Sequence, residues 1–189
     1  MNSIIEEIKN QLTASEDTQK VYSKMVKIVK VQKGQILQRE GDFATKAYYV
    51  REGLLRSYTI DENGKEHIFM FAPEGWLIAD NANLQDACDL FIDVLEDAEI
   101  EVIDKQLFDE KFISLGSVRE RLNGLYRRIA VLQKRVIMLM STPAIGRYEH
   151  FVATYPQILQ RVPQKMIASY LGITPEALSK VKNQRKSNK

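Results

Sequence analysis

The sequence predicts an α+β protein with an N-terminal antiparallel β-roll of jelly-roll type, a long dimerisation helix and a C-terminal helix-turn-helix domain. Three observations predict this order. Short apolar runs separated by turn residues fill the first half, a heptad-spaced apolar stripe follows, and two short helical patterns joined by a glycine lie near the end. We expect the roll with an opening helix at 1–105, the dimerisation helix at 106–141 and the helix-turn-helix domain at 142–189.

Composition limits the classes of protein that are possible. A chain of 189 residues that is 44% hydrophobic can bury one or two cores. Its single cysteine, Cys88, excludes an internal disulfide and any four-cysteine zinc or iron–sulfur site within one chain. There is no signal-peptide pattern, and no apolar run approaches about 18 residues. We therefore expect a cytoplasmic protein that does not bind or span a membrane.

The two halves of the chain carry opposite charge. Residues 1–104 contain 11 Lys or Arg and 20 Asp or Glu, a net charge of −9, whereas residues 105–189 contain 16 and 5, a net charge of +11. A basic half is what neutralisation of nucleic-acid phosphates requires. The charge therefore agrees with double-stranded DNA as a partner.

The acidic half, residues 1–104, is predicted to form β strands. Apolar runs at 28–31, 47–50, 54–60 and 67–71 are separated by turn signals, of which Asp61-Glu62-Asn63-Gly64 indicates a tight hairpin. Many short strands without intervening helices suggest a sandwich or roll. A helix from about 3 to 24 is expected before the first strand.

A heptad stripe then follows the roll. Its apolar residues repeat at intervals of 3 and 4, which predicts a two-stranded coiled coil and a symmetric homodimer. The alternative is a helix that packs this stripe on its own roll. We expect Thr142 to cap the next helix, with Pro143 in its first turn. The predicted dimer-interface residues are Leu115, Val118, Leu122, Leu125, Ile129, Leu132, Val136 and Leu139.

Residues 164–183 have the spacing of a helix-turn-helix. The first helix, 164–171, places Ile167, Ala168 and Leu171 on one face, and Gly172 is free to take a left-handed conformation at the turn. Thr174 then suits the N-cap of a second helix and Pro175 its first position. The alternative interpretation is an ordinary helical hairpin.

The second helix presents polar side chains outward, as DNA-reading helices do. Glu176 suits a cytosine amino group and Lys180 a guanine. Alternatively, Glu176 stabilises the positive helix end and Lys180 touches phosphate only. The predicted DNA-binding residues are Gln164, Lys165, Thr174, Pro175, Glu176, Ser179, Lys180, Asn183 and Arg185.

This order of parts resembles the Crp/Fnr family of bacterial transcription regulators over nearly the whole chain. The resemblance implies a cyclic-nucleotide-binding-type roll, DNA binding as a homodimer and RNA polymerase as a further partner. Pro175 departs from the Arg often found there, which implies a shifted target sequence. The motifs that carry the resemblance are Lys33-Gly34-Gln35-Ile36-Leu37, Glu40-Gly41-Asp42, Tyr48-Tyr49-Val50, Gly53-Leu54-Leu55-Arg56, Pro73-Glu74-Gly75-Trp76 and Gly146-Arg147.

The chain departs from that resemblance where members that bind cyclic nucleotides carry Gly-Glu and Arg followed by a small residue. Here Ala79-Asp80 and Cys88-Asp89 stand near those positions, and no Lys or Arg occurs from 66 through 104. An anionic phosphate would meet repulsion, so we expect no cyclic AMP and no other cofactor. Either the pocket is packed by its own side chains or it takes a neutral or cationic effector. Its candidate residues are Trp76, Leu77, Ala79, Asp80, Cys88, Asp89, Leu132 and Gln133.

Two other classes of protein are alternatives. A cupin-like metalloenzyme would need several histidines with a carboxylate, but only His67 and His150 are present, so we expect no metal site and no enzyme activity. His67 is expected to be exposed or hydrogen-bonded in a strand. Cys88 lies among carboxylates that raise a thiol pKa. A dimeric interaction module would keep the heptads but would give the polar face of the last helix no role.

Overall fold

The computed structural model describes residue 24 and residues 26–80, 84–107 and 118–187. The chain clusters into two compact units, a β unit and a helical unit, and residues 64–68 group with the C-terminal helices. Of the opening helix expected from about 3 to 24, residues 3–23 lie outside the described residues, as does the predicted interface residue Leu115.

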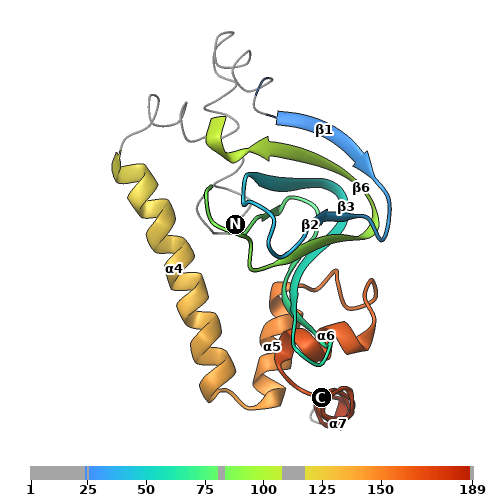
Figure 1. Ribbon diagram of the computed structural model, residues 1–189. Helices are drawn as coiled ribbons and strands as arrows, with labels where there is room; N and C mark the ends of the chain where they lie inside the picture. Colours follow the sequence, from blue (N-terminus) through green and yellow to red (C-terminus); the bar gives the residue numbers. More distant parts are fainter. Residues whose placement is uncertain (1–23, 25, 81–83, 108–117, 188–189) are drawn as a thin grey trace. The chain divides into compact units, whose positions relative to one another are not determined.

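The β unit is built on a six-stranded sheet (Figure 1). Its main path runs β1-β6-β3-β4, with β2 paired to β6 and β5 paired to β3. Strand β6 runs antiparallel to β1, β2 and β3. The antiparallel sheet predicted from the sequence is thus confirmed. The strands are β1 Val26–Val31, β2 Ile36–Gln38, β3 Lys46–Ile60, β4 Glu66–Ala72, β5 Leu77–Ile78 and β6 Phe91–Asp104.

Strand β3 joins two of the predicted runs through an irregularity at Gly53. Its register against β6 shifts between Val50 and Leu55, and Gly53 has φ 96°. A Cβ added to Gly53 would lie 2.5 Å from the carbonyl oxygen of Asp97. Only glycine fits this position, because the backbone is left-handed there and β6 is in direct contact.

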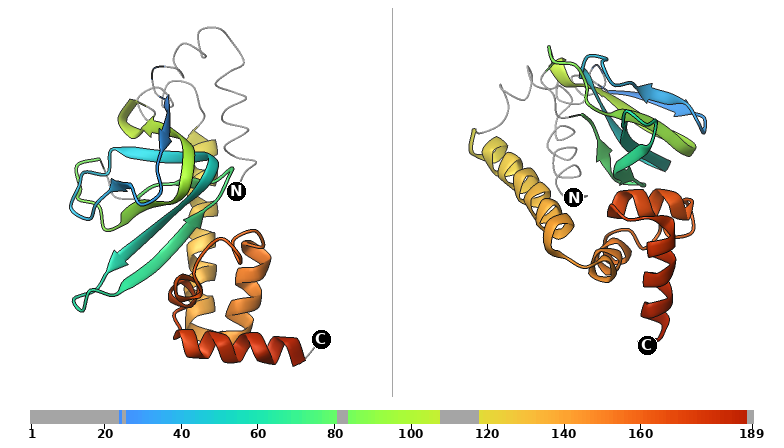
Figure 2. Two further views of the ribbon diagram at one scale, coloured as in Figure 1. Left: turned by 90° about the vertical axis from the view of Figure 1, so that its right-hand side faces the viewer. Right: turned by 60° about the horizontal axis from the view of Figure 1, so that its bottom comes forward.

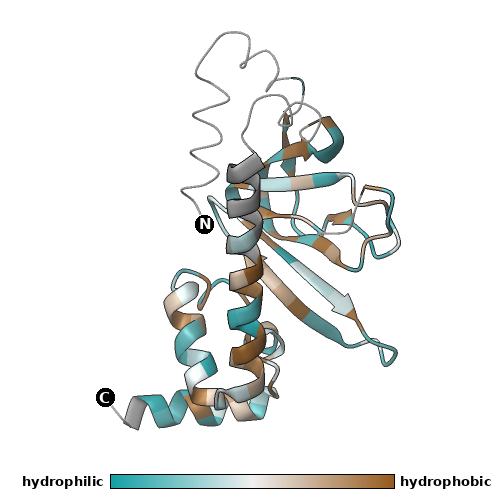
Figure 3. Ribbon diagram, turned by 90° about the vertical axis from the view of Figure 1, so that its left-hand side faces the viewer, coloured by the Kyte–Doolittle hydropathy of each residue, from teal (hydrophilic) through white to brown (hydrophobic). Residues whose placement is uncertain are grey.

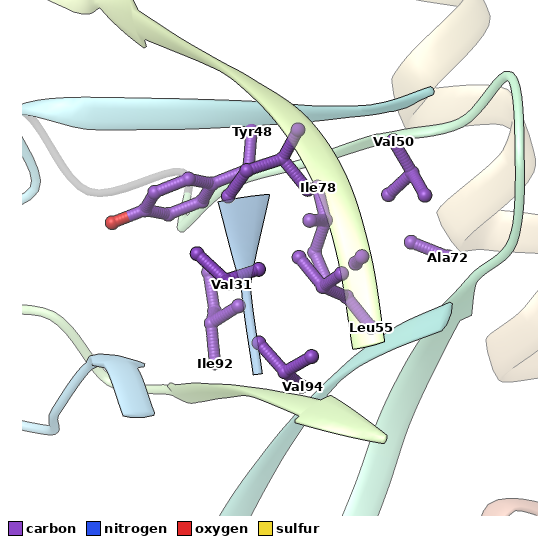
Figure 4. Close-up of a cluster of buried hydrophobic side chains, with 10 residues drawn as sticks. Val31, Tyr48, Val50, Leu55, Ala72, Ile78, Ile92 and Val94 are labelled. Atoms are coloured by element: carbon purple, nitrogen blue, oxygen red, sulfur yellow. The ribbon is translucent and has the colours of Figure 1, made fainter. Parts of the chain in front are cut away.

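A cluster of apolar side chains fills the interior of the roll (Figure 4). Val50, Leu55, Ile92 and Ile100 are fully buried, and each such side chain contributes roughly 1.5–3 kcal/mol to folding. The phenol of Tyr48 enters the same cluster and donates to the carbonyl oxygen of Leu37 at 2.9 Å. The core is therefore packed and its polar group has a partner.

One ion pair is buried in the sheet. Arg56 on β3 donates from Nε and Nη2 to the two carboxylate oxygens of Asp93 on β6, at 2.8 and 2.9 Å. The Arg56 guanidinium also lies 4.1 Å from the ring centroid of Tyr58, which stacks on Phe91. The bidentate pairing satisfies both charges where water does not reach.

The helical unit contains the long helix and three shorter ones. Helices α5, α6 and α7 contact one another, and α6 and α7 cross steeply (Figure 2). Phe151, Tyr155 and Tyr170 form an aromatic cluster at their centre, with ring centroids 5.3 to 5.6 Å apart. No helix in the described ranges is long and apolar enough to cross a membrane. The helices are α4 Val118–Ser141, α5 Ala144–Thr154, α6 Gln164–Leu171 and α7 Pro175–Ser187.

The expected cap of α5 was wrong. Thr142 does not cap this helix, because its N–H still donates to the carbonyl oxygen of Met138 in the last turn of α4, at 3.1 Å. Pro143 takes the N-cap position, and no side chain caps α5. Proline tolerates this position because it has no N–H to satisfy.

Candidate nucleic-acid interface

The turn between α6 and α7 follows a Schellman motif. Gly172 is left-handed, with φ 65° and ψ 35°. Its N–H donates to the carbonyl oxygen of Ser169, and the N–H of Ile173 donates to that of Ala168, both at 3.0 Å. The motif satisfies the carbonyls at the end of α6 and fixes the direction in which the chain leaves it.

The start of α7 is capped as its sequence predicts. The hydroxyl of Thr174 accepts the N–H of Ala177 at 3.2 Å, and Pro175 is the first helical residue. The exposed carboxylate of Glu176 has a lowered pKa, because it accepts hydrogen bonds from its own backbone N–H and from Thr174. Glu176 thus lies at the positive end of α7, where a carboxylate stabilises the helix. This agrees with the structural interpretation of Glu176 given as the alternative to contact with a base.

Eight of the nine predicted DNA-binding residues are exposed on the α6–α7 hairpin. Beneath them, Ile167, Ala168 and Leu171 of α6 and Leu178 and Val181 of α7 are buried. Figure 3 shows α7 in the hydrophilic colour over most of its length. Arg185 is half-buried, and the exposed residues are Gln164, Lys165, Thr174, Pro175, Glu176, Ser179, Lys180 and Asn183.

Three of the polar side chains of α7 have partners within the helical unit. Lys182 donates from Nζ to Oε1 of Gln164 at 2.9 Å, which ties α7 to the start of α6. The Ser179 hydroxyl donates to the carbonyl oxygen of Pro175. The Arg185 guanidinium lies 5.7 Å from the ring centroid of Tyr148. Lys180 is exposed on the same helix, where its ammonium can reach a base edge or a phosphate.

Residues 64–68, the end of the β3–β4 turn and the start of β4, group with the helical unit and are called the hairpin tip. The hydroxyl of Ser169 accepts the N–H of Ile68 and donates to the carbonyl oxygen of Glu66, both at 2.9 Å. Arg135 of α4 donates to the carbonyl oxygen of Ile68 at 3.3 Å, and its guanidinium lies 4.3 Å from the Tyr170 ring centroid. A hollow of about 450 Å³ beside the tip is lined by residues that include Lys165, Thr174 and Pro175.

Helix α4 exposes an apolar stripe. Met138 is buried on the opposite face, and Leu139 is half-buried near the turn, 3.8 Å from where a Gly172 Cβ would lie. The side chains of Val118, Leu122 and Leu125 lie outside the described part of the structure. Exposed apolar residues along the stripe are Tyr126, Ile129, Leu132, Val136, Ile137 and Met140.

In the roll, Asp80 is the centre of the predicted pocket residues. The residue is only 4% exposed. Its carboxylate accepts the backbone N–H groups of Asp89 and Leu90 at 3.0 Å each. Lys105 donates from Nζ to the carbonyl oxygen of Asp80 at 3.2 Å. A carboxylate of the chain itself therefore holds two backbone donors of the kind that bind anionic ligands.

Comparison with known proteins agrees with this geometry. Residues 28–114 match the family described as "Cyclic nucleotide-binding domain". The "Anaerobic regulatory protein" of Aggregatibacter actinomycetemcomitans is 27% identical over 165 residues, which cover 80% of this chain and 63% of that protein. The structure of FixK2 from Bradyrhizobium japonicum has a TM-score of 0.73, with 17% identity, and covers 86% of this chain and 85% of that one.

A structure of the Crp/Fnr family from Eubacterium rectale has a TM-score of 0.67 with 16% identity, over 92% of this chain and 84% of that one. In sequence and in fold the chain is thus similar to regulators of the Crp/Fnr family. It spans about 63% of the length of the curated relatives it matches first. The fold expected from the resemblance is thus confirmed.

The other predicted pocket residues lie in both units of the chain. Trp76 is half-buried and packs against the core cluster, and Leu77 pairs with Tyr49 across β5 and β3. Ala79 is half-buried beside Asp80. Leu132 and Gln133 are exposed on α4, in the other unit, and their part in a pocket stays a prediction.

The Cys88 thiol and the Tyr48 phenol both have raised pKa values. Burial, followed by the charges of Asp80 and Asp42, raises the pKa of Cys88 to about 11. Burial, followed by Cys88 and Asp42, raises the pKa of Tyr48 to about 12. The direction expected for the Cys88 thiol is confirmed, and burial is its largest cause. A protonated, buried thiol is a poor nucleophile and a poor metal ligand.

Sequence reasoning missed three side chains that organise the helical unit. Arg147 at the start of α5 donates to two backbone carbonyls, Ser169 bridges the hairpin tip, and Lys182 holds Gln164. Only Arg147 carried a signal, the Gly146-Arg147 pair. Nothing in the local sequence indicated the contacts that Ser169 and Lys182 make, because their partners are distant in the chain.

Proposed function

We propose that the protein is a dimeric, sequence-specific DNA-binding transcription regulator that does not respond to cyclic AMP. The observation that carries this proposal is the exposed polar face of α7, held at a fixed angle to α6 by a Schellman turn and a capped start. Its exposed residues include Glu176, Lys180 and Asn183, which suit base edges in a major groove.

The dimer would form along the exposed stripe of α4, from Ile129 through Val136. An apolar stripe of this kind favours pairing with a second copy around a two-fold axis. Two reading helices would then face successive turns of one DNA face, about 34 Å apart. The expected target is therefore an inverted repeat.

The roll would not take cyclic AMP, for two reasons. The carboxylate of Asp80 already accepts the N–H groups of Asp89 and Leu90, and Trp76 packs on the core. A cyclic phosphate would have to displace the Asp80 carboxylate from these hydrogen bonds, and the negative charge of that carboxylate would repel the phosphate. The protein would act in the cytoplasm without enzyme activity, and RNA polymerase would be a further partner.

The first experiment incubates the purified, ligand-free protein with fragmented genomic DNA at near-physiological salt and sequences the retained fragments. We expect enrichment of an inverted repeat with half-sites centred about 10 to 11 base pairs apart. Uniform retention at this salt would mean phosphate binding only. That result, or no retention, would contradict the proposal that the free protein reads sequence.

Lys180→Ala then tests the reading face. We expect a loss of affinity for the enriched site of roughly 5- to 150-fold if Lys180 contacts a base, because such contacts discriminate by about 1–3 kcal/mol. Lys46→Ala, at an exposed lysine that begins β3, is the matched control and should bind as the wild type does. Equal losses in both variants would point to general charge rather than to the α7 face.

A further inference from the structure

Arg147 joins the ends of two helices that are far apart in the sequence. From the first turn of α5, its Nε donates to the carbonyl oxygen of Thr142 at 2.8 Å and its Nη1 donates to that of Leu171 at 3.1 Å. Thr142 follows the last residue of α4 and completes its final turn, and Leu171 is the last residue of α6. One guanidinium thus contacts both helix ends.

The charge and shape of arginine suit this position. The last carbonyls of a helix carry partial negative charge, which a cation stabilises. A guanidinium holds its donors in a rigid planar fork, so two acceptors bound to it keep a fixed separation. The side chain is half-buried, so water competes less for these hydrogen bonds than at an exposed site.

The surroundings of Arg147 leave little freedom for the junction. A Cβ added to Gly146 would lie 2.7 Å from Cγ2 of Thr142, so α5 contacts the end of α4 directly. A Cβ added to Gly172 would lie 3.7 Å from Nη1 of Arg147 and 3.8 Å from Cδ2 of Leu139. The end of α4, the start of α5 and the turn before α7 therefore meet around one side chain.

We propose that Arg147 is a positioning residue that fixes the angle between the dimerisation helix α4 and the DNA-reading hairpin, and so sets the half-site spacing that the dimer accepts. The inference rests on the proposed function, in which α4 forms the two-fold axis. Any rotation at the junction is repeated in both protomers, so it changes the distance between the two reading helices twice over. Arg147 needs no contact with DNA for this role.

The experiment measures the affinity of the dimer for its enriched inverted repeat and for versions lengthened or shortened by one base pair. One base pair shifts a half-site by about 3.4 Å and rotates it by roughly 34° around the duplex. The wild type should lose at least about tenfold in affinity on either change, since a rigid dimer cannot follow both displacements.

Arg147→Met keeps the aliphatic stem and removes the donors. We expect about tenfold weaker binding to the original repeat and a spacing dependence reduced to about threefold or less. Arg147→Lys keeps the charge but lacks the planar fork, and should lie between the two. Glu149→Ala, at an exposed residue of the same helix, is the control and should match the wild type. Dimer mass and melting temperature are recorded for each variant.

An Arg147→Met dimer that retains the wild-type spacing preference would overturn the inference, even if it binds more weakly, because a merely stabilising role leaves spacing unchanged. Should Arg147→Met fail to fold, Arg147→Lys decides in the same way. If the wild type itself selects no repeat, the proposed function fails rather than the role of Arg147.

Discussion

The carboxylate of Asp80 accepts the backbone N–H of Leu90 at 3.0 Å, and the same Oδ2 atom accepts the N–H of Asp89. A single buried side chain therefore binds the two backbone N–H groups that directly precede β6. Next to Asp89, the backbone carbonyl oxygen of Cys88 accepts the N–H of Gly41, and the backbone N–H of Cys88 donates to the carbonyl oxygen of Asp42. The roll supplies its own anion where a phosphate would need backbone donors.

Asp80→Ala should destabilise the roll. Removal of the carboxylate leaves two part-buried N–H groups without their acceptor, which costs about 1–3 kcal/mol for each group that water cannot reach. Urea unfolding followed by circular dichroism measures the change. Asp89→Ala, at an exposed neighbour, should change the free energy of unfolding by no more than about 0.5 kcal/mol. Equal midpoints for Asp80→Ala and wild type would contradict the role of Asp80.

Cyclic AMP should leave the melting temperature of the wild-type protein unchanged. A ligand present at about 100 times its dissociation constant would stabilise the folded state by about 2.7 kcal/mol, which a thermal scan resolves easily. Differential scanning fluorimetry at millimolar cyclic AMP, with 5′-AMP as the control nucleotide, measures the shift. A saturable rise with cyclic AMP alone would show that the roll accepts the phosphate after all.

Arg56→Met should be strongly destabilising. It leaves Asp93 as a buried, uncompensated charge, which typically costs about 3–5 kcal/mol. The double variant with Asp93→Leu removes both charges and should recover much of the loss. Chemical denaturation of both variants tests this coupling. If the double variant is no more stable than Arg56→Met, the loss comes from packing around Tyr58 rather than from the unpaired charge.

Stability should fall at alkaline pH through Tyr48 and Cys88. The pKa of Tyr48 is raised from 10.0 to about 12 and that of Cys88 from 9.0 to about 11. The unfolded chain therefore releases these protons first, and stability present below pH 9 declines as pH rises towards 11 and 12. Urea unfolding from pH 8 to 11 measures the decline.

Tyr48→Phe isolates the phenol in that series. The variant should be less stable than wild type at pH 8 by about 1 kcal/mol, because the hydrogen bond to Leu37 is lost. It should also decline less steeply above pH 10, since phenylalanine has no proton to release. Parallel curves for wild type and variant would mean that other groups cause the alkaline loss.

Val136→Glu should convert the dimer to a monomer. Val136 is 54% exposed on the apolar stripe of α4, and a charge buried in a helix–helix seam opposes association. Val131→Glu is a matched control on the same helix, at a valine that is 59% exposed and lies about 140° around the helix from Val136. Sedimentation equilibrium should show a monomer for the first variant only. A dimer in both would place the interface elsewhere.

The helix-turn-helix could be read from the sequence because its rules are local. Ile167, Ala168 and Leu171 repeat with the period of a helix, and all three are buried. Gly172 was expected to be left-handed and has φ 65°. Thr174 was expected to cap α7 and accepts the N–H of Ala177. Each of these features depends on residues within one turn of the chain.

Strand β6 was absent from the prediction, although it pairs with three other strands. Its many acidic residues obscure the alternation of a half-buried strand. In the fold these acids meet cations from β3. Asp93 pairs with Arg56, and Arg51 lies 3.0 Å from Glu99 and 3.7 Å from Glu101. The paired residues lie between 37 and 50 positions apart in the chain, so no local pattern reveals them.

The sequence by itself determined the order of the parts, the antiparallel roll and the helix-turn-helix, because periodicity, turn residues and caps act over a few residues. Only the tertiary structure decided which distant groups meet: Asp80 with the N–H of Leu90, and Arg147 with the carbonyls of Thr142 and Leu171. A side chain that hydrogen-bonds to a backbone group can have a residue of any type as its partner, since every residue carries a carbonyl and nearly every one an N–H. The sequence therefore does not show which residue that partner is.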